Sequence, residues 1–126
     1  MEIHVTNRQR AIAVDLRALQ KFALAALPVC LEECESAPDA VLGGLEEVFV
    51  VLVSDRRSAT LHAQFLDESG PTDVITFAHG EVVIGCGVAR AQAAEHRETL
   101  SRELCRYIVH GLLHLNGYEE IGRAHV

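Results

Sequence analysis

The 126-residue sequence lacks any apolar run near the ~18–20 residues that a membrane-spanning helix needs, which excludes such a helix. A basic stretch followed by an apolar one is missing from residues 1–5, so we expect no secretory signal and a cytoplasmic protein. Internal repeats, low-complexity tracts and Ser/Gly-rich linkers are also missing. Residues 1–126 are therefore expected to form a single domain.

Positive charge is scarce. Lys21 is the only lysine, and 11 basic residues stand against 18 acidic ones, which gives a net charge of −7. Proteins that coat duplex DNA without sequence preference carry a basic stripe, because the release of counterions from phosphate supplies that affinity. The sequence has no such stripe, so binding to DNA is not expected. Contact with structured RNA through a small local patch remains open.

The four cysteines include no CxxC pair. In a chain without an export signal, Cys30, Cys34, Cys86 and Cys105 are expected to be reduced, mostly buried thiols that behave as small hydrophobic residues. Cys30 and Cys34 are four residues apart and could share a helix face, but no second pair of Cys or His stands near them. A metal site at this pair is therefore disfavoured.

Hydrophobic periodicity and turn residues predict an alternation of strands and helices. The expected strands cover residues 2–6, 46–53, 74–77 and 81–85, and the expected helices cover residues 12–27, 56–66, 88–97 and 100–115. Pro28 limits the first helix, and Asn116-Gly117 ends the last. The apolar run of the second strand predicts burial on both faces, and the short link between the last two strands predicts an antiparallel hairpin. This order predicts an α/β (α+β) domain with a small mixed four-stranded sheet packed against helices.

The last helix carries the most informative pattern. His110 and His114 are four residues apart, so both imidazoles leave one helix face one turn apart. A single helix supplies two neighbouring ligands to a tetrahedral Zn²⁺ in this way. Gly117 then breaks the helix, and a third ligand six residues beyond His114, at Glu120, would close the site and leave one position open for water.

An HxxxH pair is a weak motif alone, since seven histidines in 126 residues give about 0.4 such pairs by chance. The alternative is that His110 and His114 are two histidines at the edge of the core of an amphipathic helix. Gly117 and Glu120 shift the balance toward a metal site.

The segment 110–120 resembles the signature of the YbeY family of rRNA maturation factors, also described as single-strand endoribonucleases. That signature runs H-G-x-L-H-L-x-G-Y-D-H, and the sequence matches it from His110 through Tyr118. Three further blocks resemble the family in order and spacing: residues 53–55 (VSD), 70–77 (GPTDVITF) and 80–84 (GEVVI).

The resemblance implies a zincin-like fold with one zinc ion per chain and a role in rRNA processing. It implies zinc ligation by His110, His114 and position 120, where the family usually has His and this chain has Glu120. His₂Glu is an accepted catalytic set, and its added negative charge is expected to make a bound water less acidic. Glu119 and His125 are neighbours that could replace Glu120 as the ligand, and His125 ranks second.

Two further positions bear on the chemistry. The family carries an arginine five residues before the proline of its P-T-D block, suited to gripping phosphate. Leu66 occupies that place here, so the clamp is missing unless Arg56, Arg57 or another arginine reaches the cleft. Gly111 stands where HExxH metalloproteases have the glutamate that acts as general base, so proteolysis by that route is not expected.

The resulting hypothesis is a zinc-dependent endoribonuclease that acts on single-stranded or ribosomal RNA during rRNA maturation and ribosome assembly, with ribosomal particles as partners. A metal-bound water is the expected nucleophile. One alternative is a non-catalytic, metal-stabilised ribosome assembly factor, which Leu66 and the net charge of −7 favour. The other is a metal-dependent hydrolase of a different substrate.

The remaining polar residues are expected to have structural roles. Ser54 and Asp55 offer N-cap oxygens to the second helix, and Asp73 is expected to cap the turn before its strand. The other histidines have no spacing partner that indicates ligation: His4, His62, His79 and His96.

Overall fold

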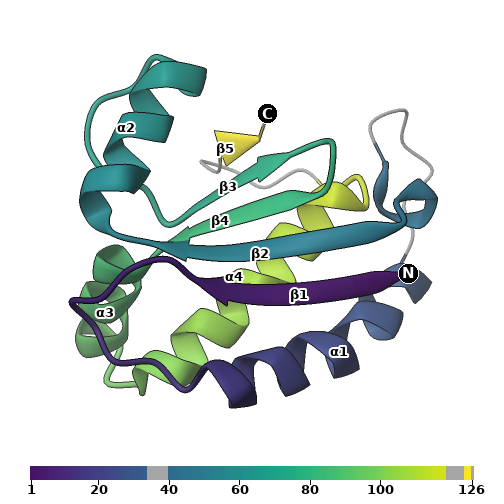
Figure 1. Ribbon diagram of the computed structural model, residues 1–126, viewed down its shortest axis with the longest axis horizontal. Coiled ribbons are helices and arrows are strands. Elements are labelled where there is room, and N and C mark those ends of the chain that lie inside the picture. The colour runs from purple at the N-terminus through teal and green to yellow at the C-terminus, as the bar shows by residue number, and fades with distance from the viewer. Residues whose placement is uncertain (34–39, 119–123, 126) are drawn as a thin grey trace.

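The computed structural model describes residues 1–33, 40–118 and 124–125, which form a layered α/β fold (Figure 1). In chain order the elements are β1 (Glu2–Asn7), α1 (Leu16–Glu32), the 3₁₀ turn η1 (Leu42–Gly44), β2 (Glu47–Val53), α2 (Asp55–Leu66), β3 (Val74–Phe77), β4 (Glu81–Gly85), α3 (Cys86–Glu95), α4 (Leu100–Leu115) and β5 (Ala124–His125). None of the helices in these ranges combines the length and the apolar character that a bilayer crossing requires.

The strands form one mixed sheet in the order β1-β2-β4-β3-β5. β1, β2 and β4 run parallel, and β3 pairs antiparallel with β4, which confirms the predicted hairpin. The predicted mixed sheet of four strands is confirmed, and the short β5 extends it by pairing parallel with Ile75 and Thr76. Two residues leave no alternation of polar and apolar side chains, so the sequence pattern could not predict β5.

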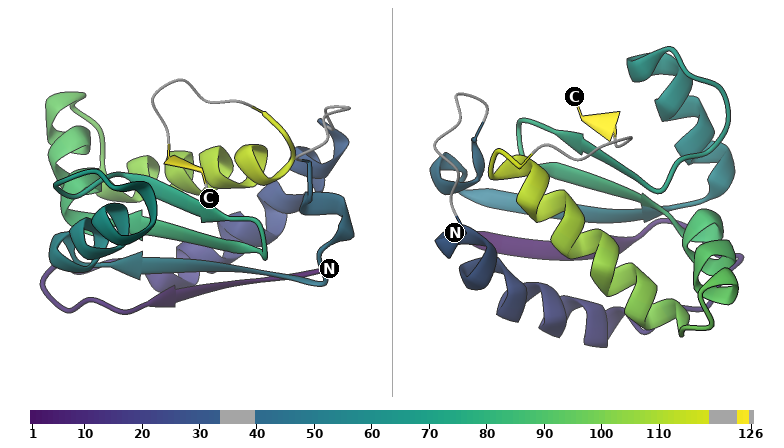
Figure 2. Two further views of the ribbon diagram at one scale, coloured as in Figure 1. Left: turned by 90° about the horizontal axis from the view of Figure 1, so that it is seen from above. Right: turned by 180° about the vertical axis from the view of Figure 1, so that it is seen from behind.

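One face of the sheet is covered by α1 and α4, with α3 packed beside α4 (Figure 2). Inward side chains such as Ile3, Val50 and Ile84 are at most 2% exposed and pack with Leu19 of α1 and Leu112 of α4. Burial of each such side chain contributes about 1.5–3 kcal/mol to the free energy of unfolding. This core fixes α4, which carries the predicted histidine pair, against the strands.

Helix α1 differs from its prediction at both ends. It begins at Leu16, because Asp15 caps it by accepting a 3.1 Å hydrogen bond from the N–H of Ala18. It then runs through Pro28 to its end at residue 32, so the prediction that Pro28 limits the helix is wrong. Pro28 removes the hydrogen bond to the carbonyl of Leu24, but both residues are exposed, so water can satisfy that carbonyl.

The opposite face of the sheet is covered in part by α2. Leu61 of α2 packs with Val53, Ile75 and Phe77 in a second apolar cluster. Phe49, in the first half of β2, is 43% exposed, so the prediction that this strand is buried on both faces is wrong for that half. Figure 1 shows why: α2 lies at one end of this face and does not cross the start of β2.

Candidate metal centre

Two histidines lie together on one side of α4. The ring centroids of His110 and His114 are 5.6 Å apart and the ring planes make an angle of 51°. His114 is only 5% exposed, and the Nε2 atoms of both rings are buried. A tetrahedral zinc ion that two imidazoles bind at about 2.0–2.1 Å holds their centroids about 5 Å apart. The pair therefore fits two positions of one metal shell after a small movement.

The amphipathic pattern of α4 holds this pair in place. Thr99 caps the helix by accepting a 3.1 Å hydrogen bond from the N–H of Arg102. Leu104, Ile108 and Leu112, which the sequence predicts as the apolar face, are all buried in the core. The histidines lie on the flank of the helix beside this face, where His114 is buried and His110 is partly buried.

Gly111 allows α4 to lie close to the sheet. A Cβ added at position 111 would be 2.4 Å from Cγ1 of Val82, in β4. A side chain at this position would therefore point at the sheet and not at an ion between His110 and His114. The glutamate general base of HExxH proteases has no room here, which agrees with the expectation from the sequence.

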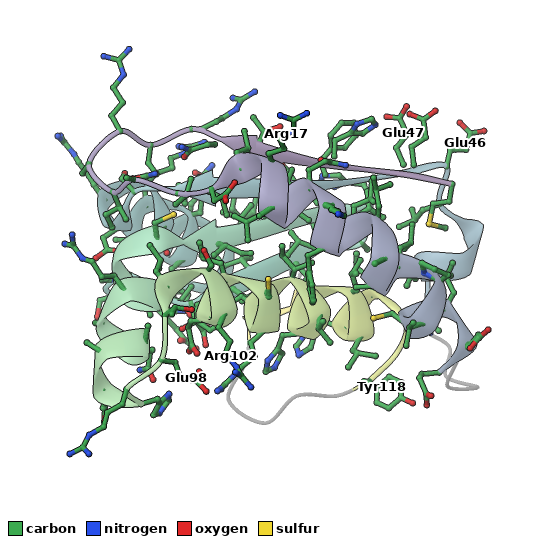
Figure 3. The ribbon with its side chains drawn as sticks, turned by 90° about the horizontal axis from the view of Figure 1, so that it is seen from below. Arg17, Glu46, Glu47, Glu98, Arg102 and Tyr118 are labelled. Atoms are coloured by element: carbon green, nitrogen blue, oxygen red, sulfur yellow. The ribbon has the colours of Figure 1, made fainter. Side chains whose placement is uncertain are left out.

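The end of α4 turns the chain sharply, as Asn116-Gly117 predicts. Gly117 has a φ of +93°, which favours glycine. Its N–H donates to the carbonyl of His114 at 3.1 Å, and the N–H of Tyr118 donates to the carbonyl of Leu113 at 3.0 Å. Together these two bonds form a Schellman motif. Figure 3 shows Tyr118 just past the end of the helix, so the chain changes direction directly after the second histidine.

The third predicted ligand, Glu120, lies outside the described residues, and so does Glu119. The backbone of His125 is described, and it pairs with Thr76 in the ladder between β3 and β5. Thr76 is fully buried on the side of the sheet that α4 covers. Residues 124 and 125 thus lie at the edge of β3, and the choice between Glu120 and His125 stays a prediction.

Leu66, at the place of the family arginine, is the last residue of α2. It is half-buried against the apolar cluster beneath α2, which includes Phe77. Of the two arginines named as substitutes, Arg57 lines a groove together with Arg8. That groove lies on the face of the sheet opposite α4, and not beside the histidine pair.

The structural roles predicted for the other polar residues are mostly confirmed. Ser54 caps α2 by accepting a 3.1 Å hydrogen bond from the N–H of Arg57, in the first turn of that helix. Asp73 accepts a 2.7 Å bond from the N–H of the next residue, at the start of β3. Asp55 differs: its carboxylate accepts a 3.1 Å bond from the N–H of Val88, so it caps α3 across the fold.

A second group able to hold a metal ion is present, which the sequence did not predict. Ligand atoms of Glu2, His4 and Glu47 lie within 4.8 Å of one another. The parallel register places Glu2 opposite Glu47, and His4 Nε2 is 3.1 Å from a carboxylate oxygen of Glu2. Both carboxylates are exposed, and Glu47 points outward at one end of the sheet (Figure 3). Sequence spacing cannot reveal this group, because it depends on the register between strands.

The cysteines that the structure describes are free thiols. Burial raises the pKa of the Cys30 and Cys105 thiols, and burial together with the nearby Asp55 raises the pKa of Cys86 to about 11. A raised pKa disfavours the thiolate form that binds metals. Cys34 lies outside the described residues, so the Cys30–Cys34 pair is not tested.

Known proteins of similar sequence and structure identify the family of this chain. The sequence model of Endoribonuclease YbeY matches residues 4–125. An Endoribonuclease YbeY of Frankia alni is 33% identical over 94% of this chain and 71% of its own length. The Endoribonuclease YbeY of Leifsonia xyli is also 33% identical, over 94% of this chain and 82% of its own length. The solution structure of TM1509 from Thermotoga maritima is 26% identical and superposes with a TM-score of 0.59 over 93% of this chain and 73% of its own. With a match across almost its whole length, this chain belongs to the Endoribonuclease YbeY family.

Proposed function

We propose that residues 1–126 form one zinc-dependent endoribonuclease domain that cleaves single-stranded RNA during rRNA maturation and ribosome assembly. Ribosomal particles in the cytoplasm are its proposed partners, and neither DNA nor membranes are. The observation that carries this proposal is the pair of buried imidazole nitrogens on α4. Support for the substrate class comes from relatives that are named endoribonucleases.

In this proposal His110, His114 and Glu120 hold one zinc ion, with His125 as the alternative third ligand. Two imidazoles and a carboxylate are an accepted set for a catalytic zinc site that keeps one position open. When bound, the ion supplies Lewis acidity toward a phosphoryl oxygen and lowers the pKa of water so that it can react near neutral pH.

The chain itself orients these ligands. Two hydrogen bonds fix the backbone directly after His114, so this side chain needs little reordering to bind an ion. The close contact between Gly111 and Val82 keeps α4 against β4 and sets the height of both imidazoles above the sheet. Their buried Nε2 atoms are shielded from bulk water, which strengthens electrostatic interactions at the site.

Metal analysis of the purified protein tests the ligand pair. Wild type is expected to hold one zinc ion per chain, and His110→Ala and His114→Ala are each expected to lose it, because two ligands leave an incomplete shell. His96→Ala, at an exposed histidine just after α3, is the matched control and should keep its zinc. Wild-type protein that emerges metal-free and takes up no Zn²⁺ at micromolar concentration would contradict the proposal.

The third ligand is tested separately. Glu120→Gln is expected to weaken zinc binding markedly, because an amide oxygen carries no charge, and Glu120→His is expected to restore it with a third imidazole. If His125 is the ligand, His125→Ala should be the damaging change. Equal zinc affinity in wild type and Glu120→Gln would show that Glu120 does not bind the metal.

Leu66 favours a second candidate function, that of a non-catalytic, metal-stabilised ribosome assembly factor. Cleavage of RNA needs charge stabilisation at the phosphoryl oxygens, and the loss of one preorganised contact of this kind costs about 10²–10³ in rate. The side chain at position 66 packs against apolar residues and offers no charge. Isolated protein is therefore expected to cleave RNA weakly or not at all.

Single-turnover cleavage of a labelled single-stranded RNA separates the two candidates. We expect slow cleavage by wild type and none by His114→Ala. Leu66→Arg should cleave faster, provided that the arginine side chain reaches from the end of α2 to the metal centre. Fast cleavage by wild type with no effect of Leu66→Arg would mean that another group supplies the positive charge. Binding of ribosomal particles without cleavage by wild type or Leu66→Arg would favour the assembly factor.

A further inference from the structure

A groove of about 920 Å³ lies on the face of the sheet that α1 and α4 leave uncovered. The strands β1 to β4 form its floor, and α2 borders it at one end (Figure 1). Its lining combines aromatic, aliphatic and basic side chains, chief among them Arg8, Phe49, Val51, Arg57, Phe65 and Phe77. This open-face groove is separated from the histidine pair of α4 by the sheet.

Aromatic rings are concentrated in the open-face groove. Three of the four phenylalanines of the chain line it, and two of them, Phe49 and Phe65, are 43% and 47% exposed. Phe49 stacks with His4 at 5.3 Å between ring centroids. Phe77 stacks with His79 at 5.6 Å and meets Phe65 edge to face at 5.2 Å. Exposed rings gathered in one hollow indicate a partner that covers them.

Strand register arranges the rings in a row across the sheet. His4 of β1 lies opposite Phe49 of β2, Phe49 lies opposite Glu81 of β4, and Glu81 lies opposite Phe77 of β3. Neighbouring strands are about 4.8 Å apart, so the two phenylalanines stand about 10 Å apart with a carboxylate between them. Phe77 is buried and supports Phe65, so the exposed rings of Phe49 and Phe65 are the ones that can accept unstacked bases. A carboxylate accepts hydrogen bonds from base amino groups.

Positive charge lies to one side of this row, in the direction of the carboxyl ends of β1 and β2. Arg8 is four residues past His4, about 13 Å along the strand, and Arg57 lies in the first turn of α2. Both arginines are exposed, and neither forms an ion pair with any residue that the structure describes. The groove thus carries two positive charges against one negative charge, at Glu81, although the whole chain carries −7.

We propose that the open-face groove binds single-stranded RNA, with bases stacked on Phe49 and Phe65 and with phosphates at Arg8 and Arg57. The substrate class rests on the function proposed above, but the binding face is separate from the metal centre. Stacking accepts every base, and arginine neutralises phosphate, which is how proteins bind single strands without sequence preference. A duplex keeps its bases stacked and cannot use the rings.

Fluorescence anisotropy of a labelled single-stranded RNA, measured in EDTA to prevent cleavage, tests the stacking. Phe49→Leu keeps an apolar side chain but removes the ring, so binding is expected to weaken about 5- to 100-fold. Phe49→Tyr keeps the ring and is expected to retain the wild-type affinity. Far-UV circular dichroism of each variant verifies that the fold is intact.

The same assay at several salt concentrations tests the arginines. Replacement of Arg8 and Arg57 together by Gln removes two phosphate contacts, so the slope of log affinity against log salt should decrease in magnitude by about 1.4. Arg17→Gln is the matched control, because Arg17 lies on α1, on the covered face of the sheet, and should leave the slope unchanged (Figure 3).

His114→Ala distinguishes this proposal from the proposed function, since it should abolish cleavage in zinc and leave RNA affinity unchanged. Equal affinities of wild type, Phe49→Leu and the double arginine variant overturn the groove proposal, even where wild type cleaves RNA. Wild-type protein that binds no single-stranded RNA overturns it as well. So does a Phe49→Leu variant that changes only self-association in sedimentation, which would make the groove a contact between two copies of the chain.

Discussion

Replacement of Gly111 by alanine tests whether close packing of α4 on β4 positions the histidine pair. The new Cβ would be 2.4 Å from Cγ1, 3.0 Å from Cγ2 and 3.3 Å from Cβ of Val82. Val82 is fully buried in a strand with neighbours on both sides, so it has no free space to enter. Either α4 or β4 must move to relieve this contact.

Two opposing effects determine how much Gly111→Ala changes the free energy of unfolding. In an exposed helix, this substitution stabilises the fold by about 1 kcal/mol, because glycine is a poor helix former. Overpacking of a dense core costs about 1–3 kcal/mol. Since the contact involves two methyl groups of Val82, the cost should lie near the upper end, and the expected net loss is about 1–2 kcal/mol. Zinc affinity should fall too, because α4 would carry both imidazoles away from the third ligand.

Urea unfolding in EDTA measures this loss apart from the effect of bound metal, with circular dichroism as the signal because the chain has no tryptophan. Gly43→Ala is the matched control, since nothing lies within 4 Å of its added Cβ, and its stability should not fall. Val82→Ala removes both methyl groups that the new Cβ would meet. The loss of stability in the double variant Gly111→Ala/Val82→Ala should therefore be smaller than the sum of the two single losses, by at least about 1 kcal/mol. Additive losses, or a Gly111→Ala variant as stable as wild type, would refute the reasoning.

Three other substitutions test neighbouring features. Gly117→Ala should lose about 1–2 kcal/mol in urea unfolding, because a φ of +93° strains a residue with a Cβ, and Gly117→Asn should lose less. Burial and Asp55 raise the pKa of Cys86 from 9.0 to about 11, so this thiol ionises at lower pH in the unfolded chain than in the folded one. The free energy of unfolding should therefore fall between pH 9 and pH 11, and it should fall less steeply in Cys86→Ala. Leu66→Arg should lower Tm, because it removes an apolar side chain from the cluster beneath α2; an unchanged Tm would show that the side chain at position 66 does not stabilise this cluster.

Features of the fold that depend on residues close together in the sequence could be predicted. The bounds of α4, β3 and β4 follow from apolar spacing, a cap at Thr99 and the turn residues around them. The passage of α1 through Pro28 could not be predicted, because it depends on whether the carbonyl of Leu24 faces water. The exposure of Phe49 depends on where α2 lies, which periodicity within a strand does not specify.

The candidate site also has one part that the sequence predicts and another that it does not. His110 and His114 are neighbours through one helical turn, so their proximity follows from sequence spacing. The group of Glu2, His4 and Glu47 and the aromatic row of the open-face groove depend on the register of β1 with β2 and of β2 with β4, whose paired residues are more than 30 positions apart. Spacing along the chain carries no information about such register.

The contact at Gly111 also limits what the chain can do chemically. Since position 111 faces Val82 in β4, no side chain there can act as a base toward a substrate at the histidine pair. In the proposed function, hydrolysis at this pair would then depend on a bound metal and on groups that neutralise the phosphate. Position 66 supplies no such charge, and it packs beneath α2 on the same face of the sheet as the groove arginines, Arg8 and Arg57, opposite α4. With Arg8 and Arg57 in the groove across the sheet from the histidine pair, this arrangement favours the holding of RNA over its fast cleavage.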